Sequence, residues 1–186
     1  MMDLDGRIPL VIDGGPCTVG LESTVLDLTQ AMPRILRPGG ITREQLTSVI
    51  GSVTIDDSVM RQLGPDEAAP SPGMRYRHYA PRGHLTLVKG GREAVASRIR
   101  ALYAEKPNSC VIARTINLPL YKGLRVFDMG EDALTAARNL FSILRQMDDL
   151  DVEYILAESF PEEGMGLAVM NRLARAAAFD IIEAGL

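Results

Sequence analysis

The sequence lacks the features of several protein classes. Its 186 residues include only two cysteines, Cys17 and Cys110, with no CxxC pair, which excludes a disulfide framework and a structural zinc site as organising principles. No apolar run approaches the roughly 18 residues needed to cross a bilayer, and the first residues lack the basic-then-apolar order of a signal peptide. With 24 acidic and 20 basic side chains, the net charge of −4 argues against a protein that coats nucleic acid. We therefore expect a cytoplasmic protein without a membrane partner.

The first 51 residues read as three strands and one helix. Strand-type segments occur at residues 8–13, 23–28 and 34–37. Thr42 and Gln45 form a capping-box pattern that predicts a helix to about Ile50, ended by Gly51. Three strands and one helix can enclose only a small core. We therefore expect these elements to be the edge of a larger sheet. Periodicity then fades over residues 52–84, where repeated prolines predict a long extended connection.

Strands and helices alternate after residue 84. Strands are expected at residues 85–88, 109–113, 124–127 and 153–157, helices at 92–105, 132–147 and 167–178, and a short tail at 180–182. Continuous apolar strands between amphipathic helices indicate a mostly parallel sheet with helices on both faces. The fold class is therefore α/β, and this second part is expected to be a small Rossmann-like domain.

Two short motifs in the first part carry candidate binding residues. The glycine-rich stretch 14–27 places the hydroxyls of Ser23 and Thr24 at the start of a strand, where one can face a pocket. Local features alone favour the alternative, an ordinary hairpin with solvated hydroxyls. Arg37 lies at a strand end before a Pro-Gly turn, where a guanidinium suits bidentate phosphate binding. The alternative for Arg37 is a surface arginine beside a turn.

The most unusual stretch is residues 71–84, which holds three arginines, two tyrosines, both histidines of the chain and no acid. Such a segment suits an anionic, partly planar ligand, a nucleotide or a nucleic-acid backbone, better than a plain solvated linker. Two other candidates favour a structural interpretation. The glycine loop before the last helix is preceded by Glu162 and Glu163, which repel phosphate, and Asp148, Asp149 and Asp151 are typical of a solvated helix end rather than of a metal site.

Four segments in this order resemble the threonylcarbamoyl-AMP synthase family, in its two-domain form with a YrdC-like catalytic domain: GGPCTVGLESTVLD, PRILRPGGIT, SPGMRYRHYAP and GMGLAVMNRLARAA. The resemblance runs from about Asp13 to the C-terminus. It implies that residues 1–51 are the C-terminal remnant of the catalytic domain, that 52–84 are a linker folding over the active site, and that 85–186 are the C-terminal α/β domain.

The resemblance also implies a reaction, in which L-threonine, bicarbonate and ATP give L-threonylcarbamoyl-AMP and pyrophosphate for the modification of tRNA. Ser23 and, more weakly, Thr24 would contact threonine. The residues implied for ATP are Arg37, Tyr76, Arg77, His78 and Tyr79. Mg²⁺ is expected to arrive with ATP, no residue is assigned as catalytic, and the implied partners are tRNA and downstream tRNA threonylcarbamoyl-transfer proteins.

The sequence departs from the family pattern in one respect. The Lys-x-Arg and Ser-Ala-Asn segments of the catalytic domain do not occur, so we expect an N-terminally truncated chain that does not catalyse the reaction alone. The alternatives are a non-catalytic module that binds RNA or a partner protein through its Arg/Tyr-rich linker, and a fragment that only scaffolds.

Overall fold

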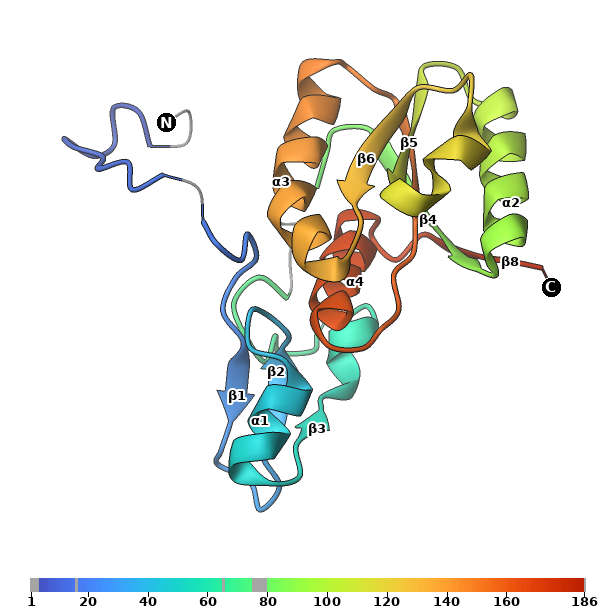
Figure 1. Ribbon diagram of the computed structural model, residues 1–186. Helices are drawn as coiled ribbons and strands as arrows, with labels where there is room; N and C mark the ends of the chain where they lie inside the picture. Colours follow the sequence, from blue (N-terminus) through green and yellow to red (C-terminus); the bar gives the residue numbers. More distant parts are fainter. Residues whose placement is uncertain (1–3, 16, 65, 75–79, 186) are drawn as a thin grey trace.

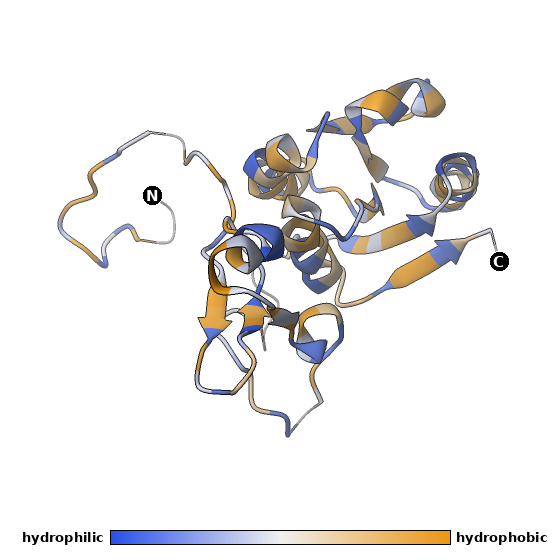
Figure 2. Ribbon diagram, turned by 60° about the horizontal axis from the view of Figure 1, so that its bottom comes forward, coloured by the Kyte–Doolittle hydropathy of each residue, from blue (hydrophilic) through white to orange (hydrophobic). Residues whose placement is uncertain are grey.

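The computed structural model describes residues 4–15, 17–64, 66–74 and 80–185, and it contains two separate sheets (Figure 1). Residues 4–15 form a segment that extends away from both sheets in each view (Figures 1 and 2). The expected strand at residues 8–13 is therefore wrong. Leu10 and Ile12 are 72% and 86% exposed, and no described strand pairs with this segment, so its apolar alternation has nothing to pack against.

The first sheet is small and has three strands in the order β1-β2-β3. Its elements are β1 (Val25–Asp27), β2 (Arg34–Arg37), α1 (Arg43–Ile50) and β3 (Thr54–Ile55). Strands β1 and β2 are antiparallel, whereas β3 runs parallel to β2. The capping box is confirmed, since Thr42 accepts from the Gln45 amide while the Gln45 side chain accepts from the Thr42 amide. Helix α1 nevertheless has no buried residue, and the buried apolar side chain of the strands is Ile35.

The second sheet has five strands in the order β6-β5-β7-β4-β8, and every neighbouring pair is parallel, as the sequence predicts. Its strands are β4 (His84–Gly90), β5 (Ser109–Arg114), β6 (Val126–Gly130), β7 (Tyr154–Glu158) and β8 (Ile181–Ala184). The helices are α2 (Arg92–Glu105), the 3₁₀ helix η2 (Thr115–Tyr121), α3 (Ala133–Asp149) and α4 (Met165–Ala176). The tail expected at residues 180–182 is the start of β8, which pairs with β4 and so completes the sheet.

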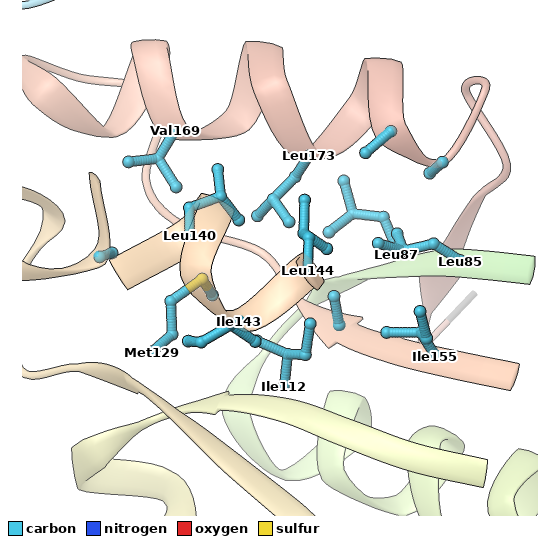
Figure 3. Packing of buried hydrophobic residues seen from close by; sticks show 14 of the residues in the cluster. Leu85, Leu87, Ile112, Met129, Leu140, Ile143, Leu144, Ile155, Val169 and Leu173 are labelled. Carbon is cyan, nitrogen blue, oxygen red and sulfur yellow. The ribbon is translucent and has the colours of Figure 1, made fainter. Parts of the chain in front are cut away.

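Two apolar clusters cover the two faces of this sheet. One face packs against α3 and α4, through side chains that include Leu140, Leu144 and Leu173 (Figure 3). The other face packs against α2 and η2, through residues such as Ile99 and Tyr121. Every residue of α4 except the first is buried, so this helix lies inside the molecule rather than on its surface.

The expected extended connection at residues 52–84 is more structured than its sequence indicates. It contains β3 and the 3₁₀ helix η1 (Asp57–Met60), and Val59 and Met74 are buried with Leu167 in a third apolar cluster. Both elements are too short to give a periodic pattern, which is why the sequence shows none. Within the described residues, no helix combines the length and the apolar character needed to span a membrane.

Candidate functional site

The candidate site begins with Arg37 at the end of β2, which contacts Ser23 directly. The Arg37 Nε and Nη2 atoms donate to the Ser23 carbonyl at 3.1 and 3.0 Å, and Nη2 lies 3.3 Å from Ser23 Oγ. The two residues were candidates from separate motifs, and the antiparallel pairing of β1 with β2 brings those motifs together. The structure therefore joins a hydroxyl and a guanidinium in one place.

Gly39 explains how the two motifs approach so closely. A Cβ atom at this position would lie 2.2 Å from the Glu22 carbonyl oxygen, a distance that no side chain tolerates. The neighbouring Gly40 amide donates to the same carbonyl at 3.3 Å. The Pro-Gly-Gly turn after Arg37 therefore holds the loop of Glu22 and Ser23 through backbone contact.

Ser23 and Thr24 have different environments. The Thr24 hydroxyl donates to the Ile41 carbonyl at 2.5 Å and accepts from the Ile41 amide at 3.1 Å, so its hydrogen bonds fasten the loop. Ser23 is exposed. Of the two expected threonine-binding hydroxyls, the one at Ser23 is available to a ligand.

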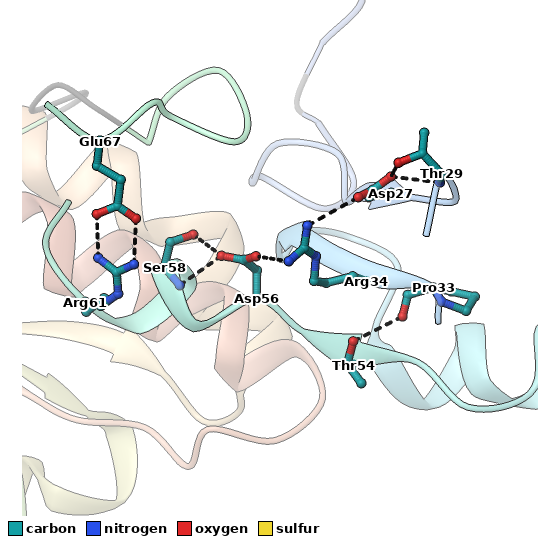
Figure 4. A network of polar contacts seen from close by, with 9 residues as sticks. All are labelled: Asp27, Thr29, Pro33, Arg34, Thr54, Asp56, Ser58, Arg61 and Glu67. Atoms are coloured by element: carbon teal, nitrogen blue, oxygen red, sulfur yellow. Dashed lines mark hydrogen bonds and ion pairs between the residues drawn. The ribbon is translucent and has the colours of Figure 1, made fainter. Parts of the chain in front are cut away.

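The two arginines of β2 also differ in charge environment. Arg34 pairs with Asp27 at 3.4 Å and with Asp56 at 3.0 Å (Figure 4). Hydrogen bonds from Thr29 lower the pKa of Asp27, and a hydrogen bond from Ser58 lowers the pKa of Asp56. In both cases the effect of Arg34 on the pKa is smaller. Arg34 is therefore neutralised locally.

Arg37 contacts carbonyl oxygens instead of carboxylates. Its Nη1 atom donates to the Pro72 carbonyl at 3.0 Å, in addition to the Ser23 contacts. No carboxylate of the described residues lies within ion-pair distance of Arg37, so its positive charge remains available to an anion. Arg37 also joins β2 to the linker, because Pro72 lies within the Arg/Tyr-rich stretch.

Four other residues are expected to bind ATP and lie outside the described residues: Tyr76, Arg77, His78 and Tyr79.

Helix α4 supplies a polar face that the sequence analysis did not identify. Arg172 is 4% exposed and its Nε lies 2.9 Å from a carboxylate oxygen of Glu22, the residue before Ser23. Arg175 donates to the Met74 carbonyl and, at 3.0 Å, to that of Ser58, while Asn171 donates to the Val59 carbonyl at 2.5 Å.

The spacing of these three polar residues, i, i+1 and i+4, places them on one side of the helix. Burial, followed by the nearby Arg172 charge, lowers the pKa of Arg175 to about 10, which still leaves it protonated at neutral pH. Gly73 has a φ of +79°, and a Cβ there would lie 3.8 Å from Arg172 and 4.0 Å from Arg37, so the linker backbone passes close to two guanidinium groups.

Helix α3 holds the other end of the glycine-rich loop. Arg138 Nε donates to the Thr18 carbonyl at 2.6 Å. Gly20 has a φ of +80°, and a Cβ there would lie 2.5 Å from the Arg138 Cα, so the loop lies directly on the helix. Two helices of the five-stranded domain therefore position the loop that carries Ser23.

Arg82, at the other end of the Arg/Tyr-rich stretch, contacts acidic residues of this chain. Its backbone amide donates to Asp148 at 2.7 Å, and its guanidinium lies 3.2 Å from a carboxylate oxygen of Asp151. The acidic residues at the end of α3 thus bind an arginine of this chain. Across the described ranges, no group of three or more His, Cys, Asp or Glu side chains is placed to hold a metal ion.

Known proteins resemble this chain in sequence. The family model for the C-terminal domain of threonylcarbamoyl-AMP synthase matches residues 41–178. The threonylcarbamoyl-AMP synthases of Pyrococcus abyssi and Bacillus subtilis are 42% and 41% identical to the chain, each over 97% of its length. The chain spans about half the length of these relatives, 53% and 52%.

A solved structure extends the likeness to three dimensions. The crystal structure of P. abyssi Sua5 complexed with L-threonine superimposes with a TM-score of 0.85 and 41% identity, over 97% of this chain and 53% of the other. The match therefore covers both sheets. Family model, sequence relatives and structure all agree, and the chain belongs to the threonylcarbamoyl-AMP synthase family.

Proposed function

We propose that this chain forms the C-terminal part of an L-threonylcarbamoyladenylate synthase, which serves the modification of tRNA with threonylcarbamoyladenosine. The observation that carries the proposal is the contact of Arg37 with both Ser23 and the Pro72 carbonyl. That contact assembles three of the family-like segments around one guanidinium that has no acidic partner among the described residues. A related protein has been crystallised with L-threonine, which supports an amino-acid ligand.

In the proposed reaction, the threonine amine and bicarbonate first form a carbamate with loss of water. A carbamate oxygen then attacks the α-phosphorus of ATP, and the bond from that phosphorus to the bridging oxygen breaks to release pyrophosphate. Ser23 would hydrogen-bond threonine, and Arg37 would balance the negative charge that accumulates on the phosphates. Because the carbamate and the mixed anhydride both hydrolyse readily, a linker closing over the pocket would protect them from water.

Mg²⁺ is proposed to enter with ATP, bound to its phosphates rather than to a protein cage. Tyr76, Arg77, His78 and Tyr79 are proposed to reach the nucleotide from the linker, and downstream transfer proteins are proposed to take up the product.

The surface of the three-stranded sheet supports the proposed domain organisation, with residues 1–51 as part of a catalytic domain, 52–84 as linker and 85–186 as the second domain. Val49 on α1 is 81% exposed, and Leu28 and Ile41 are 65% and 52% exposed. Exposed apolar side chains around so small a sheet suit packing against further parts of a catalytic domain. This chain alone is therefore proposed to be inactive.

The rival proposal, an RNA- or partner-binding module, gains little from the structure. It needs a positively charged strip, yet Asp148 and Asp151 already bind Arg82. An RNA module would show a steep loss of affinity with salt, because phosphate contacts release counterions.

The test begins with the mass of the endogenous protein, detected with an antibody against residues 85–186. A band well above 20.2 kDa is expected. The endogenous protein, tagged at its C-terminus and purified, should then make threonylcarbamoyl-AMP from L-threonine, bicarbonate and Mg-ATP. Arg37→Gln should lower kcat/KM for ATP by about 10²–10³-fold, the usual effect of losing one charge-stabilising donor.

Arg34→Gln is the matched control, because Arg34 lies on the same strand but is neutralised by Asp27 and Asp56. It should leave kcat/KM within a few fold of the unmodified protein. A band at 20.2 kDa together with no synthesis would overturn the proposal in favour of the binding module. Equal losses for the two variants would remove the assigned role of Arg37.

A further inference from the structure

The order of the strands in the five-stranded sheet marks a second place where a ligand can bind. After β4 and β5 the chain crosses on the face of α2 and η2, whereas after β6 and β7 it returns on the face of α3 and α4. Strand β7 lies between β5 and β4 in the sheet. The chain leaves β7 on one face of the sheet, whereas it leaves β5 and β4 on the other face. In open parallel sheets, such a switch point opens a crevice that commonly holds a ligand.

A cavity of about 210 Å³ occupies this position. It is lined at the ends of three neighbouring strands by Gly90 of β4, Arg114 of β5 and Glu158 of β7, and by Ser159, which follows β7. The remaining wall comes from the start of α2 and from η2, through Arg92 and Asn117 among others. Its volume is below the roughly 300 Å³ at which pockets for drug-sized molecules begin, so it suits a small ligand or one group of a larger one.

Two arginines line this cavity, and no ion pair joins either of them to an acidic side chain of the described residues. Arg114 lies at an irregularity in the pairing of β5 with β6, its guanidinium carbon is 5.2 Å from the centre of the Phe160 ring, and its buried Nε has no hydrogen-bond partner. Arg92 donates to Asn117 Oδ1 at 2.8 Å and to the Ile116 carbonyl at 3.0 Å. Both groups thus retain donors for an anion.

Glu158 fixes the groups around the cavity through three hydrogen bonds. This carboxylate is 2% exposed and accepts from the Tyr121 hydroxyl at 2.6 Å, from Asn117 Nδ2 at 2.9 Å and from the Arg114 backbone amide at 2.9 Å. Since Asn117 donates to Glu158, its carbonyl oxygen must turn toward Arg92. A chain of hydrogen bonds from the core therefore fixes the Arg92 guanidinium, as a prepared binding site requires.

Helix α2 adds backbone donors to the same place. It begins at Arg92, has fourteen residues, and its capping residue Gly91 provides no side-chain hydrogen bond. The first amide groups of the helix therefore remain available at the positive end of its dipole. Together with two guanidinium groups, they match a phosphoryl group better than a single carboxylate.

We propose that the crevice at the carboxyl ends of β4, β5 and β7 binds a phosphoryl anion through Arg92 and Arg114. It is distinct from the site of Ser23 and Arg37, and it gives the C-terminal domain a ligand of its own. Free phosphate, pyrophosphate and the phosphate of a mononucleotide share the required chemistry. The size of the cavity means that the base and ribose of a nucleotide would extend beyond it.

The test titrates the full chain with inorganic phosphate, pyrophosphate and AMP, each separately, while amide chemical shifts are followed by NMR. Saturable shifts are expected at Gly90, Arg114 and Ser159. Arg114→Gln and Arg92→Gln should each weaken binding at least about tenfold, the usual contribution of a hydrogen bond to a charged group. Arg98→Gln is the matched control, because Arg98 is an exposed arginine of α2 outside the cavity lining, and it should leave the affinity unchanged.

The three ligands distinguish the sources of the phosphoryl group, since AMP binding tighter than phosphate would indicate a nucleotide. Arg37→Gln separates this site from the proposed synthase site, because it should not change the shifts at Gly90 and Ser159. Arg92 is exposed, so Arg92→Gln remains informative if Arg114→Gln does not fold. No saturable shift at millimolar concentrations of any ligand, or binding that only Arg37→Gln weakens, would overturn the proposal.

Discussion

The two sheets of this chain are stabilised in different ways. The five-stranded sheet is covered on both faces by apolar side chains, and α4 is buried almost completely. The three-stranded sheet has a helix with no buried residue. The loop before it is joined to the larger domain by polar contacts of Glu22 with Arg172 and of Thr18 with Arg138, and by the packing of Leu21 on the larger core. The five-stranded domain is stabilised by its own apolar core, whereas the three-stranded sheet depends on contacts with the larger domain. The candidate site of Ser23 and Arg37 lies at the three-stranded sheet.

The largest expected effect comes from the core of the five-stranded domain. Leu140 is fully buried between α3 and the sheet, and Leu140→Ala should lower the free energy of unfolding by about 2–5 kcal/mol, as for other large-to-small changes in a core. Urea unfolding followed by circular dichroism measures the change. Val49→Ala on the exposed face of α1 is the contrast, expected to stay within about 0.5 kcal/mol. Similar losses for both variants would contradict the difference between the two sheets.

A smaller effect is expected from the tie between Arg172 and Glu22. Arg172→Met leaves the partly buried Glu22 carboxylate without this guanidinium, and the loss should be about 1–3 kcal/mol. Native-state hydrogen exchange should show faster exchange at Ile35 in β2, with Ile155 in β7 unchanged. A cycle with Glu22→Gln isolates the pair. If exchange rises equally in β2 and β7, Arg172 stabilises the five-stranded domain itself rather than its contact with Glu22.

The smallest effect concerns the loop that follows η1, where Arg61 donates to both carboxylate oxygens of Glu67 at 2.8 and 2.6 Å (Figure 4). This hydrogen bonding, with that of the Gly64 amide, lowers the pKa of Glu67 from 4.5 to about 2. Since the folded pKa lies below the unfolded one, the stabilisation is present above pH 4.5 and is lost as the pH falls through about 2.

A carboxyl-carbon NMR titration should therefore find the Glu67 midpoint near 2. Arg61→Gln should return it toward 4.5, with no change in the unfolding of the five-stranded domain. A midpoint near 4.5 in the unmodified chain would show that the pair does not persist in solution.

The sequence predicts regular elements well where each carries its own signal. The helix predicted at residues 92–105 matches α2 residue for residue, and the capping box of Thr42 and Gln45 places α1 correctly. The expected strand at residues 124–127 instead begins at Val126. Apolar alternation at residues 8–13 lacks a described partner strand, while β3 and β8 become strands only because β2 and β4 lie beside them.

The candidate site was predictable in part. Ser23 and Arg37 come from motifs that the resemblance identifies, but their contact depends on the pairing of β1 with β2. The sequence does not single out Asn171, Arg172 and Arg175, because the larger apolar residues of the same helix, such as Met170 and Leu173, favour a structural interpretation. The available signal was their spacing on one side of an otherwise apolar helix, which indicates a polar face turned toward another part of the chain.

The strand order of the larger sheet has a consequence for biosynthesis. Strand β4 leaves the ribosome first, yet its neighbours are β7 and β8, which are made last, and β7 also separates β4 from β5. Until β7 emerges, only β5 and β6 can pair as they do in the finished sheet. Such distant pairings slow folding and leave apolar strands uncovered in the nascent chain. The domain therefore becomes committed to its fold only after β7 has been made, and a premature stop before Tyr154 would leave β4 without a partner.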